Sequence, residues 1–233
     1  MKFQQEYLSF DCAYKSLGVC HIILEFDIDA LTEQINAIID LTNLTSLTNQ
    51  TINTLLSRVD TLRDMIVNIL RVVDINTYDI LPGNAKETDI ETKTAALKQF
   101  LTRYHDISQD AIILIENQPM KIGGYGFIQK TNTESPIVAH QLCYHFSPRA
   151  RMMAPTLKGK VSLGENMHLD YFMNQFAGKF KTKSEDKRKA RKEHTKANLK
   201  WFLARFAPHI HLPESTADDA ADAFMQFLAY LKI

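Results

Sequence analysis

The stretch Ala111–Pro119, AIILIENQP, decides how the rest of the chain is interpreted. Five apolar residues, rich in isoleucine, lead directly into Glu116, Asn117 and Gln118, and a proline closes the run. A short β-branched run of this kind predicts a buried strand in the middle of a sheet. Glu116 then lies at the end of that strand. Such an acid either reaches solvent at a loop or serves as a catalytic group at the sheet edge where open α/β folds place their sites.

The composition is that of an ordinary soluble globular protein, with 45% hydrophobic and 23% charged residues in a chain of 233. This length suits a single domain over residues 1–233, with a helical insertion at 29–69. No apolar run approaches the ~20 residues that cross a bilayer, and the N-terminus lacks a signal-peptide pattern, so no membrane partner is expected. Three cysteines without metal-ligand spacing predict buried thiols in a reducing intracellular compartment: Cys12, Cys20 and Cys143.

Formal charges are strongly segregated along the chain, although they sum to zero. Residues 1–110 contain 9 Lys and Arg against 16 Asp and Glu, a local charge of −7. Residues 158–207 contain 13 against 5, a local charge of +8. A charge run is most often a solvated face, but cations concentrated in one fifth of a neutral chain favour binding to a polyanion.

Two strands are predicted near the N-terminus. Tyr7–Phe10 and Leu17–Phe26 are apolar runs separated by a short link, which is the pattern of an antiparallel hairpin. This pattern places Asp11 at the end of the first strand, beside a tight turn at the sheet edge. Alternating or short apolar runs predict further strands at Leu70–Leu81 and Arg151–Pro155.

Residues 29–69 have the periodicity of helices. Apolar residues recur at spacings of three and four, except across the polar stretch 42–51 (TNLTSLTNQT). Two helices are therefore predicted, at Ala30–Leu41 and Thr51–Ile69, with Asp29 as the N-cap of the first. One continuous coiled-coil helix is the alternative, but about 36 residues of helix would end ~54 Å from their start, whereas the next strand must return to the sheet. A helical hairpin is preferred for this reason.

The rest of the chain is predicted to be mainly helical. Gly123, Gly124 and Gly126 indicate a turn rather than a phosphate-binding loop, because their spacing is wrong for one. Val161–Lys183 has no clear pattern and is interpreted as a mobile loop. Apolar periodicity predicts helices at Ile90–His105, Ser135–Phe146, Ser184–Phe206 and Thr216–Leu231, of which the third is strongly basic in its first half.

Further acids lie at the start of the last helix. Asp219 and Asp222 are three residues apart, so both lie on one helix face. Acids in a first helical turn are common because they suit the helix dipole, which accounts for Asp218 and Asp219 without any function. Asp222 lies deeper in the helix, between two alanines on an apolar segment. Small neighbours of this kind allow another group to approach closely.

Four acids thus lie at strand ends or near the start of a core-packed helix: Asp11, Glu116, Asp219 and Asp222. Four converging carboxylates would repel one another unless divalent cations neutralised them. Hard oxygen ligands of this kind suit Mg²⁺ or Mn²⁺. Two such ions about 4 Å apart can activate a water and stabilise the leaving oxygen in phosphodiester cleavage.

Several segments, taken together, resemble the RuvC-like Holliday junction resolvases, most closely the poxvirus-type branch found in large nucleocytoplasmic DNA viruses. The resemblance covers most of the chain outside 29–69 and 161–183. Ala13 and Ser16 stand where the family usually carries a glycine and an asparagine, and the helical insertion has no counterpart. The segments that carry the resemblance are LSFDCAYKSLGVCHIIL (8–24), LRVVDINTYDI (70–80), ILIENQP (113–119), MAPTLKGK (153–160), KRKARKEHTKANLKWFL (187–203) and DDAADAF (218–224).

The resemblance implies an α/β protein of the RNase H-like fold, with a mixed five-stranded sheet flanked by helices and a helical hairpin inserted between strands 2 and 3. It also implies two Mg²⁺ ions per active site, for which Mn²⁺ would substitute. The family uses a lysine of the basic segment near the scissile phosphate; Lys196 is the first choice and Lys192 the second. The metal-binding and catalytic acids map onto Asp11, Glu116, Asp219 and Asp222, with Asp218 as a neighbour.

The activity implied is resolution of four-way (Holliday) DNA junctions by paired symmetric nicks. A homodimer is expected, because two active sites related by a two-fold axis make such nicks simply. A nuclease of RNA–DNA hybrids or flaps and a catalytically inactive scaffold are the alternatives. The expected location is intracellular and, for a viral protein, the cytoplasmic or nuclear site where viral DNA is processed. Phosphates would be bound by Lys181, Lys183, Lys187, Arg188, Lys189, Arg191, Lys192 and Lys196.

Overall fold

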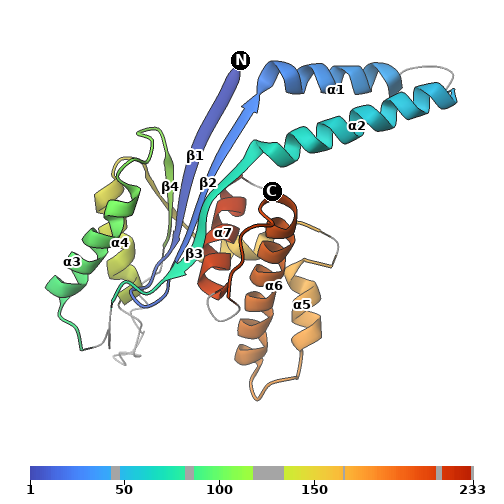
Figure 1. Ribbon diagram of the computed structural model, residues 1–233. Coiled ribbons are helices and arrows are strands. Elements are labelled where there is room, and N and C mark those ends of the chain that lie inside the picture. Colours follow the sequence, from blue (N-terminus) through green and yellow to red (C-terminus); the bar gives the residue numbers. More distant parts are fainter. Residues whose placement is uncertain (43–47, 82–86, 118–133, 165, 214–216, 232–233) are drawn as a thin grey trace.

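The computed structural model describes residues 1–42, 48–81, 87–117, 134–164, 166–213 and 217–231. The chain forms one mixed five-stranded sheet with helices on both faces (Figure 1). This confirms the predicted α/β class and the predicted sheet. The strands are β1 (Lys2–Asp11), β2 (Leu17–Asp27), β3 (Leu70–Tyr78), β4 (Ile112–Glu116) and β5 (Ala150–Met153).

The strands lie in the order β3-β2-β1-β4-β5. β1, β2 and β3 are antiparallel neighbours, whereas β4 is parallel to both β1 and β5. Phe10 pairs with Ile115, so the ends of β1 and β4 lie at the same edge of the sheet. β1 begins earlier than predicted, at Lys2, because residues 2–6 pair with the end of β2 although they form no apolar run.

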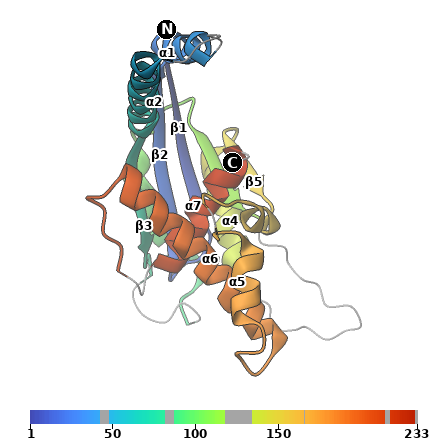
Figure 2. The same cartoon turned by 90° about the vertical axis from the view of Figure 1, so that its right-hand side faces the viewer.

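Helices cover the two faces to different depths. α3 (Ile90–Leu101), the 3₁₀ turn η1 (Thr102–Tyr104) and α4 (Glu134–Phe146) cover one face. On the other face α7 (Ala217–Leu231) packs on the sheet, α6 (Lys183–Phe206) packs on α7, and α5 (Leu169–Phe176) packs on α6 (Figures 1 and 2). The predicted loop at 161–183 therefore contains a short helix, α5, that packs against α6.

Each face of the sheet has its own hydrophobic core. Ile113 and Ile115 point into the core beneath α3 and α4, whereas Leu114 points into the core beneath α6 and α7. All three side chains are fully buried. β4 is therefore a central strand that is covered on both faces, as its apolar run predicts.

Two helices connect β2 to β3. α1 (Ile28–Thr42) continues directly from β2, and α2 (Asn49–Ile69) continues directly into β3. They lie side by side and project from one end of the sheet (Figure 1), and Arg58 Nη1 donates a hydrogen bond to Gln34 Oε1 at 3.1 Å. The chain thus forms two helices here rather than one continuous helix.

The helix starts differ from the predictions in detail. Asp27 caps α1, since its Oδ1 accepts from the backbone nitrogens of Asp29 and Ala30, so the prediction of Asp29 as N-cap is wrong. The predicted helix Ile90–His105 is divided, because its last turn is the 3₁₀ turn η1. Gly123, Gly124 and Gly126 lie outside the described residues. No helix in the described part of the chain is both long and apolar enough to cross a membrane.

Candidate functional site

Two of the predicted acids lie on adjacent strand ends. Asp11 is the last residue of β1 and Glu116 the last of β4. β1 and β4 are parallel, and Phe10 pairs with Ile115. The next residue of each strand is one of the two acids, so the acids lie next to each other at the same edge of the sheet. Glu116 is 3% exposed, so it does not simply reach solvent at a loop. An acid buried to this degree needs a charged or hydrogen-bonding partner.

The start of α7 brings the other predicted acids to this edge. α7 packs on β1, β2 and β3, and the backbone nitrogen of Ala220 donates to Thr77 Oγ1 at 3.0 Å. Gly18, which pairs with Asp11, has no side chain where the first turn of α7 passes over β2. Asp222, one turn further along, therefore lies near Asp11 although 211 residues separate them in sequence.

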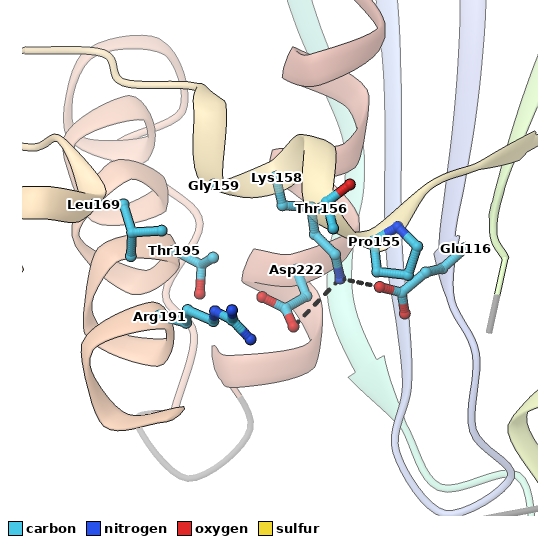
Figure 3. Close-up of a pocket in the computed structure, with 9 residues that line it drawn as sticks. All are labelled: Glu116, Pro155, Thr156, Lys158, Gly159, Leu169, Arg191, Thr195 and Asp222. Atoms are coloured by element: carbon cyan, nitrogen blue, oxygen red, sulfur yellow. Dashed lines mark ion pairs between the residues drawn. The ribbon is translucent and has the colours of Figure 1, made fainter. Parts of the chain in front are cut away.

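Lys158 joins three of the four acids. It lies in the 3₁₀ segment η2 (Pro155–Lys160), which follows β5. Its Nζ is 2.9 Å from Glu116, 3.3 Å from Asp222 and 3.4 Å from Asp11. Figure 3 shows the ammonium group between the carboxylates of Glu116 and Asp222. We refer to Asp11, Glu116, Lys158 and Asp222 as the acid–lysine cluster.

The pKa values follow from this arrangement. Burial alone would lower the pKa of Lys158, but the three carboxylates raise it well above its ordinary value. Burial raises the pKa of Asp11 and of Asp222, and the Lys158 ammonium opposes both increases. Burial also raises the pKa of Asp219, against a hydrogen bond from Ser16. The cluster is thus a desolvated set in which one cation partly compensates several anions.

Lys158 is not among the site residues that the sequence predicted. It lies in MAPTLKGK, one of the segments that carry the resemblance, whereas the predicted lysines lie in the basic helix. One local feature of the sequence could have indicated it. Lys158 lies in a short segment that starts with a proline just after the last strand, and such a segment must pack against the strand ends. That signal is weak, because the burial of Lys158 depends on β4 and α7, which are distant in sequence.

Lys192 and Lys196 contact a different acid. Both lie on α6, and both form ion pairs with Asp218, that of Lys196 at 3.5 Å. Lys196 also pairs with Glu193 at 2.6 Å. Despite partial burial, Lys192 and Lys196 lower the pKa of Asp218. Asp218 thus joins α7 to α6 beside the acid–lysine cluster.

A pocket of about 290 Å³ opens over the cluster. Glu116, Lys158 and Asp222 form one side, and Arg191 and Thr195 of α6 face them (Figure 3). Arg191 is exposed, and Thr195 is hydrogen-bonded to Asp222. Of the basic residues predicted to bind DNA, Arg191 therefore lies at the pocket itself. Others lie exposed along α6 or before it: Lys181, Lys183, Lys187, Arg188 and Lys189.

The carboxylates of the acid–lysine cluster are the candidate ligands for a metal ion. Among the described residues, no group of three or more His, Cys, Asp or Glu side chains is arranged to hold one. The carboxylate oxygens of Asp11, Glu116 and Asp222 instead surround the Lys158 ammonium. Carboxylate oxygens are of the donor class that Mg²⁺ prefers, but in this structure they are paired with a lysine.

The three cysteines differ in burial. Cys12 and Cys20 are buried free thiols, as predicted, whereas Cys143 is only half-buried. Burial is the largest cause that raises the pKa of the Cys12 and Cys20 thiols. Cys12 belongs to the core beneath α3 and α4, and Cys20 to the core beneath α6 and α7.

Comparisons with protein-family models, with characterised proteins and with solved structures found no significant match to this chain.

Proposed function

We propose that the protein is a Mg²⁺-dependent, structure-selective endonuclease of the RNase H-like fold that resolves four-way DNA junctions. One observation carries this proposal: three acids from β1, β4 and α7 converge within 3.4 Å of a single cationic nitrogen beneath a pocket. The mixed five-stranded sheet supports the fold assignment, because it places Asp11 and Glu116 on neighbouring strands.

The acids would hold the metal ions. Asp11, Glu116 and Asp222 contact one cation now, and Asp219 lies one helical turn before Asp222. Two bound Mg²⁺ ions would supply an activated water and stabilise the leaving oxygen of the phosphodiester. The chain's own task would be to hold the four carboxylates, with two strand ends and one helix packed on them.

Lys158 is our candidate for the lysine near the scissile phosphate, in preference to Lys196 and Lys192. Its charge lies inside the acid–lysine cluster, whereas the charges of the other two are directed to Asp218. A cation at this position contacts a phosphate oxygen and stabilises negative charge as it develops. Arg191 and Thr195 would position the same phosphate from the opposite wall of the pocket.

The basic helix α6 would bind the DNA backbone. Its first half carries six of the 13 cations of the +8 segment, five of them exposed, and the helix passes the pocket at Arg191. Phosphate contacts of this kind are independent of sequence and sensitive to salt. We expect recognition of junction shape rather than of bases.

A homodimer is part of the proposal, since two sites related by a two-fold axis give paired nicks. The α1–α2 pair is the candidate interface. Several large aliphatic side chains are exposed along both helices: Ile35, Ile39, Ile52, Leu56 and Val59. Their spacing of three and four places them in stripes, as in helices that pack against other helices.

An inactive scaffold is the second candidate function, and one observation favours it. Lys158 lies within 3.4 Å of three acids and partly compensates their charge, as a lysine in a structural ion-pair network does. In that case the acid–lysine cluster would be a structural ion-pair network and nothing more. Nuclease activity separates the two candidates.

The deciding experiment is cleavage of a synthetic four-way junction in Mg²⁺. The wild-type chain is expected to nick it symmetrically, and Asp219→Asn to lower the rate at least about 100-fold. Asp79→Asn is the matched control, because Asp79 is exposed and pairs only with Lys15 among the described ion pairs. Duplex, flap and RNA–DNA hybrid substrates are cut in parallel. Equal activity of Asp219→Asn would refute the catalytic assignment, and a preference for hybrids or flaps would refute the substrate.

A further inference from the structure

The connection between α5 and α6 is a projecting corner. We define the α5–α6 corner as residues 176–183, from the end of α5 to the start of α6. Figures 1 and 2 both show the corner extending beyond the rest of the layer that α5, α6 and α7 form. Thr182 caps α6, because its Oγ1 accepts from the backbone nitrogen of Glu185 at 3.2 Å. The sequence of the α5–α6 corner predicts no regular secondary structure, and no step of the proposed reaction uses the corner.

A buried carboxylate fixes the backbone of the corner. Asp186 is 8% exposed, and its two oxygens accept from the backbone nitrogens of Gly178 at 2.9 Å and Phe180 at 3.0 Å. Gly178 has φ +73°, a conformation that L side chains rarely adopt. Hydrogen bonds to a charged acceptor are stronger than neutral ones. The corner is therefore held in one conformation although it lies at the surface.

Aromatic rings lie on this fixed backbone. Phe176 and Phe180 stack with ring centroids 6.0 Å apart and planes inclined by 20°. Lys179 Nζ lies 5.5 Å from the centroid of the Phe176 ring. Phe180 is 38% exposed. An exposed phenylalanine beside a cation is suited to a ligand that is both flat and negatively charged.

The charge around the rings has one sign. Residues 176–192 contain eight Lys and Arg against two acids, Glu185 and Asp186. Asp186 is turned inward to the backbone of the corner and Glu185 is the exposed acid, and the segment keeps a net charge of +6 (8 − 2). Lys179, Lys181 and Lys183 are all exposed around Phe180. This charge is complementary to a phosphate backbone.

We propose that the α5–α6 corner is a stacking platform for unpaired bases of branched or single-stranded DNA. One base stacks on Phe180 and extends the stack with Phe176, while Lys179 and Lys181 contact the flanking phosphates. The inference rests on the proposed function, because it names the part of the DNA that the same nuclease holds at a distance from the cleavage pocket. Stacking tolerates any base, which suits recognition of a branch point by shape.

The test uses the full chain and DNA labelled with 2-aminopurine, whose fluorescence falls when it stacks. One probe is a single-stranded oligonucleotide, and the other is a four-way junction with the label at the branch point. A chelator is present, so cleavage does not contribute. We expect wild type to quench both labels, Phe180→Leu to lose the quenching and to bind about tenfold more weakly, and Phe180→Trp to retain both properties.

Two further measurements make the result specific. Tyr144→Leu removes another exposed ring, on α4 across the sheet, and should leave quenching and affinity unchanged. The salt dependence of binding should be the same in Phe180→Leu as in wild type, since no charge is removed. Unchanged quenching by Phe180→Leu at saturation would overturn the proposal. So would loss of binding to phosphatidylserine vesicles in that variant with DNA binding unaltered, because the corner would then be a membrane contact.

The outcomes also separate this inference from the proposed function. If wild type quenches the single-stranded label through Phe180 but never nicks junctions in Mg²⁺, the platform stands and the resolvase assignment fails. If wild type nicks junctions and Phe180→Leu quenches as wild type does, the resolvase assignment stands and the stacking platform fails. If wild type binds neither DNA, both proposals are wrong.

Discussion

A β-carbon placed on Gly18 would lie 2.0 Å from the carbonyl oxygen of Asp219 and 3.1 Å from the backbone nitrogen of Ala220. No real β-carbon lies this close to a carbonyl oxygen, so α7 can dock on β2 only where β2 carries a glycine. We expect Gly18→Ala to lower the free energy of unfolding by about 3 kcal/mol. Urea denaturation followed by circular dichroism measures this loss.

Gly164→Ala is the matched control for this substitution. A β-carbon there would meet Met167 at 3.4 Å and Trp201 at 3.5 Å, which are ordinary contacts. Its effect on stability should stay within about 1 kcal/mol. Equal stability of the two variants would mean that the first turn of α7 can shift without cost, and the acids would then not be fixed by β2.

Lys158→Met is expected to destabilise the protein and to make its stability depend more strongly on pH. Removal of one partner from a buried ion pair typically costs about 3 kcal/mol or more. Asp11 and Asp222 have raised pKa values in the folded state, so they bind protons more tightly folded than unfolded, and stability falls as pH rises through that range. Without the Lys158 cation these pKa values rise further, so the loss should be larger at pH 8 than at pH 5.

Thermal unfolding across this pH range tests the prediction, with Lys160→Met as control. Lys160 is two residues away in η2 but is exposed. Its replacement should change stability little at any pH. If Lys158→Met is less stable than wild type by the same amount at pH 5 and pH 8, the lysine contributes packing rather than charge.

Replacement of Lys187 and Lys189 by Gln should weaken DNA binding and its salt dependence. Both side chains are exposed on the first half of α6. For duplex DNA the slope of log K against log salt changes by about 0.9 for each phosphate that the protein no longer neutralises, so the double variant should reduce it by about 2. Lys2 of β1 and Lys98 of α3 are exposed and lie outside α6. Their replacement by Gln removes the same charge and should leave the slope unchanged.

Replacement of Ile39 and Leu56 by Gln should separate the expected dimer. Both side chains are about half exposed in the α1–α2 pair, so the monomer fold should tolerate the change. Light scattering is expected to show a mass near 26.7 kDa for this variant and twice that for wild type. Tyr144→Gln should remain dimeric. A dimer that survives the double replacement, or deletion of residues 32–62, would place the interface elsewhere.

Patterns that are local in sequence predicted much of the fold and part of the site. The apolar run before Glu116, the strand before Asp11 and the periodic helix after Asp219 each place an acid at the end of an element, and the sheet then determines where those ends meet. Lys158 could not be found in this way. Its burial is created by β4 and α7, which contact it only after folding.

The same limit applies to the basic helix. A run of cations predicts a phosphate-binding surface, but not which lysines are drawn into ion pairs. Lys192 and Lys196 pair with Asp218, and this pairing depends on how α6 packs on α7. Asp186 is a similar case. Its position in the sequence is that of an ordinary acid in the first turn of a helix, whereas its carboxylate holds the backbone of the preceding corner.

The order of these elements along the chain also has a temporal consequence. The last described helix, α7, supplies Asp219 and Asp222, yet it packs against β1, which is synthesised more than 200 residues before it. A nascent chain that ends before residue 217 holds Asp11, Glu116 and Lys158 but lacks the acids of α7. The cluster is therefore complete only after α7 has been synthesised, and a product truncated before α7 carries the basic helix without the full set of acids.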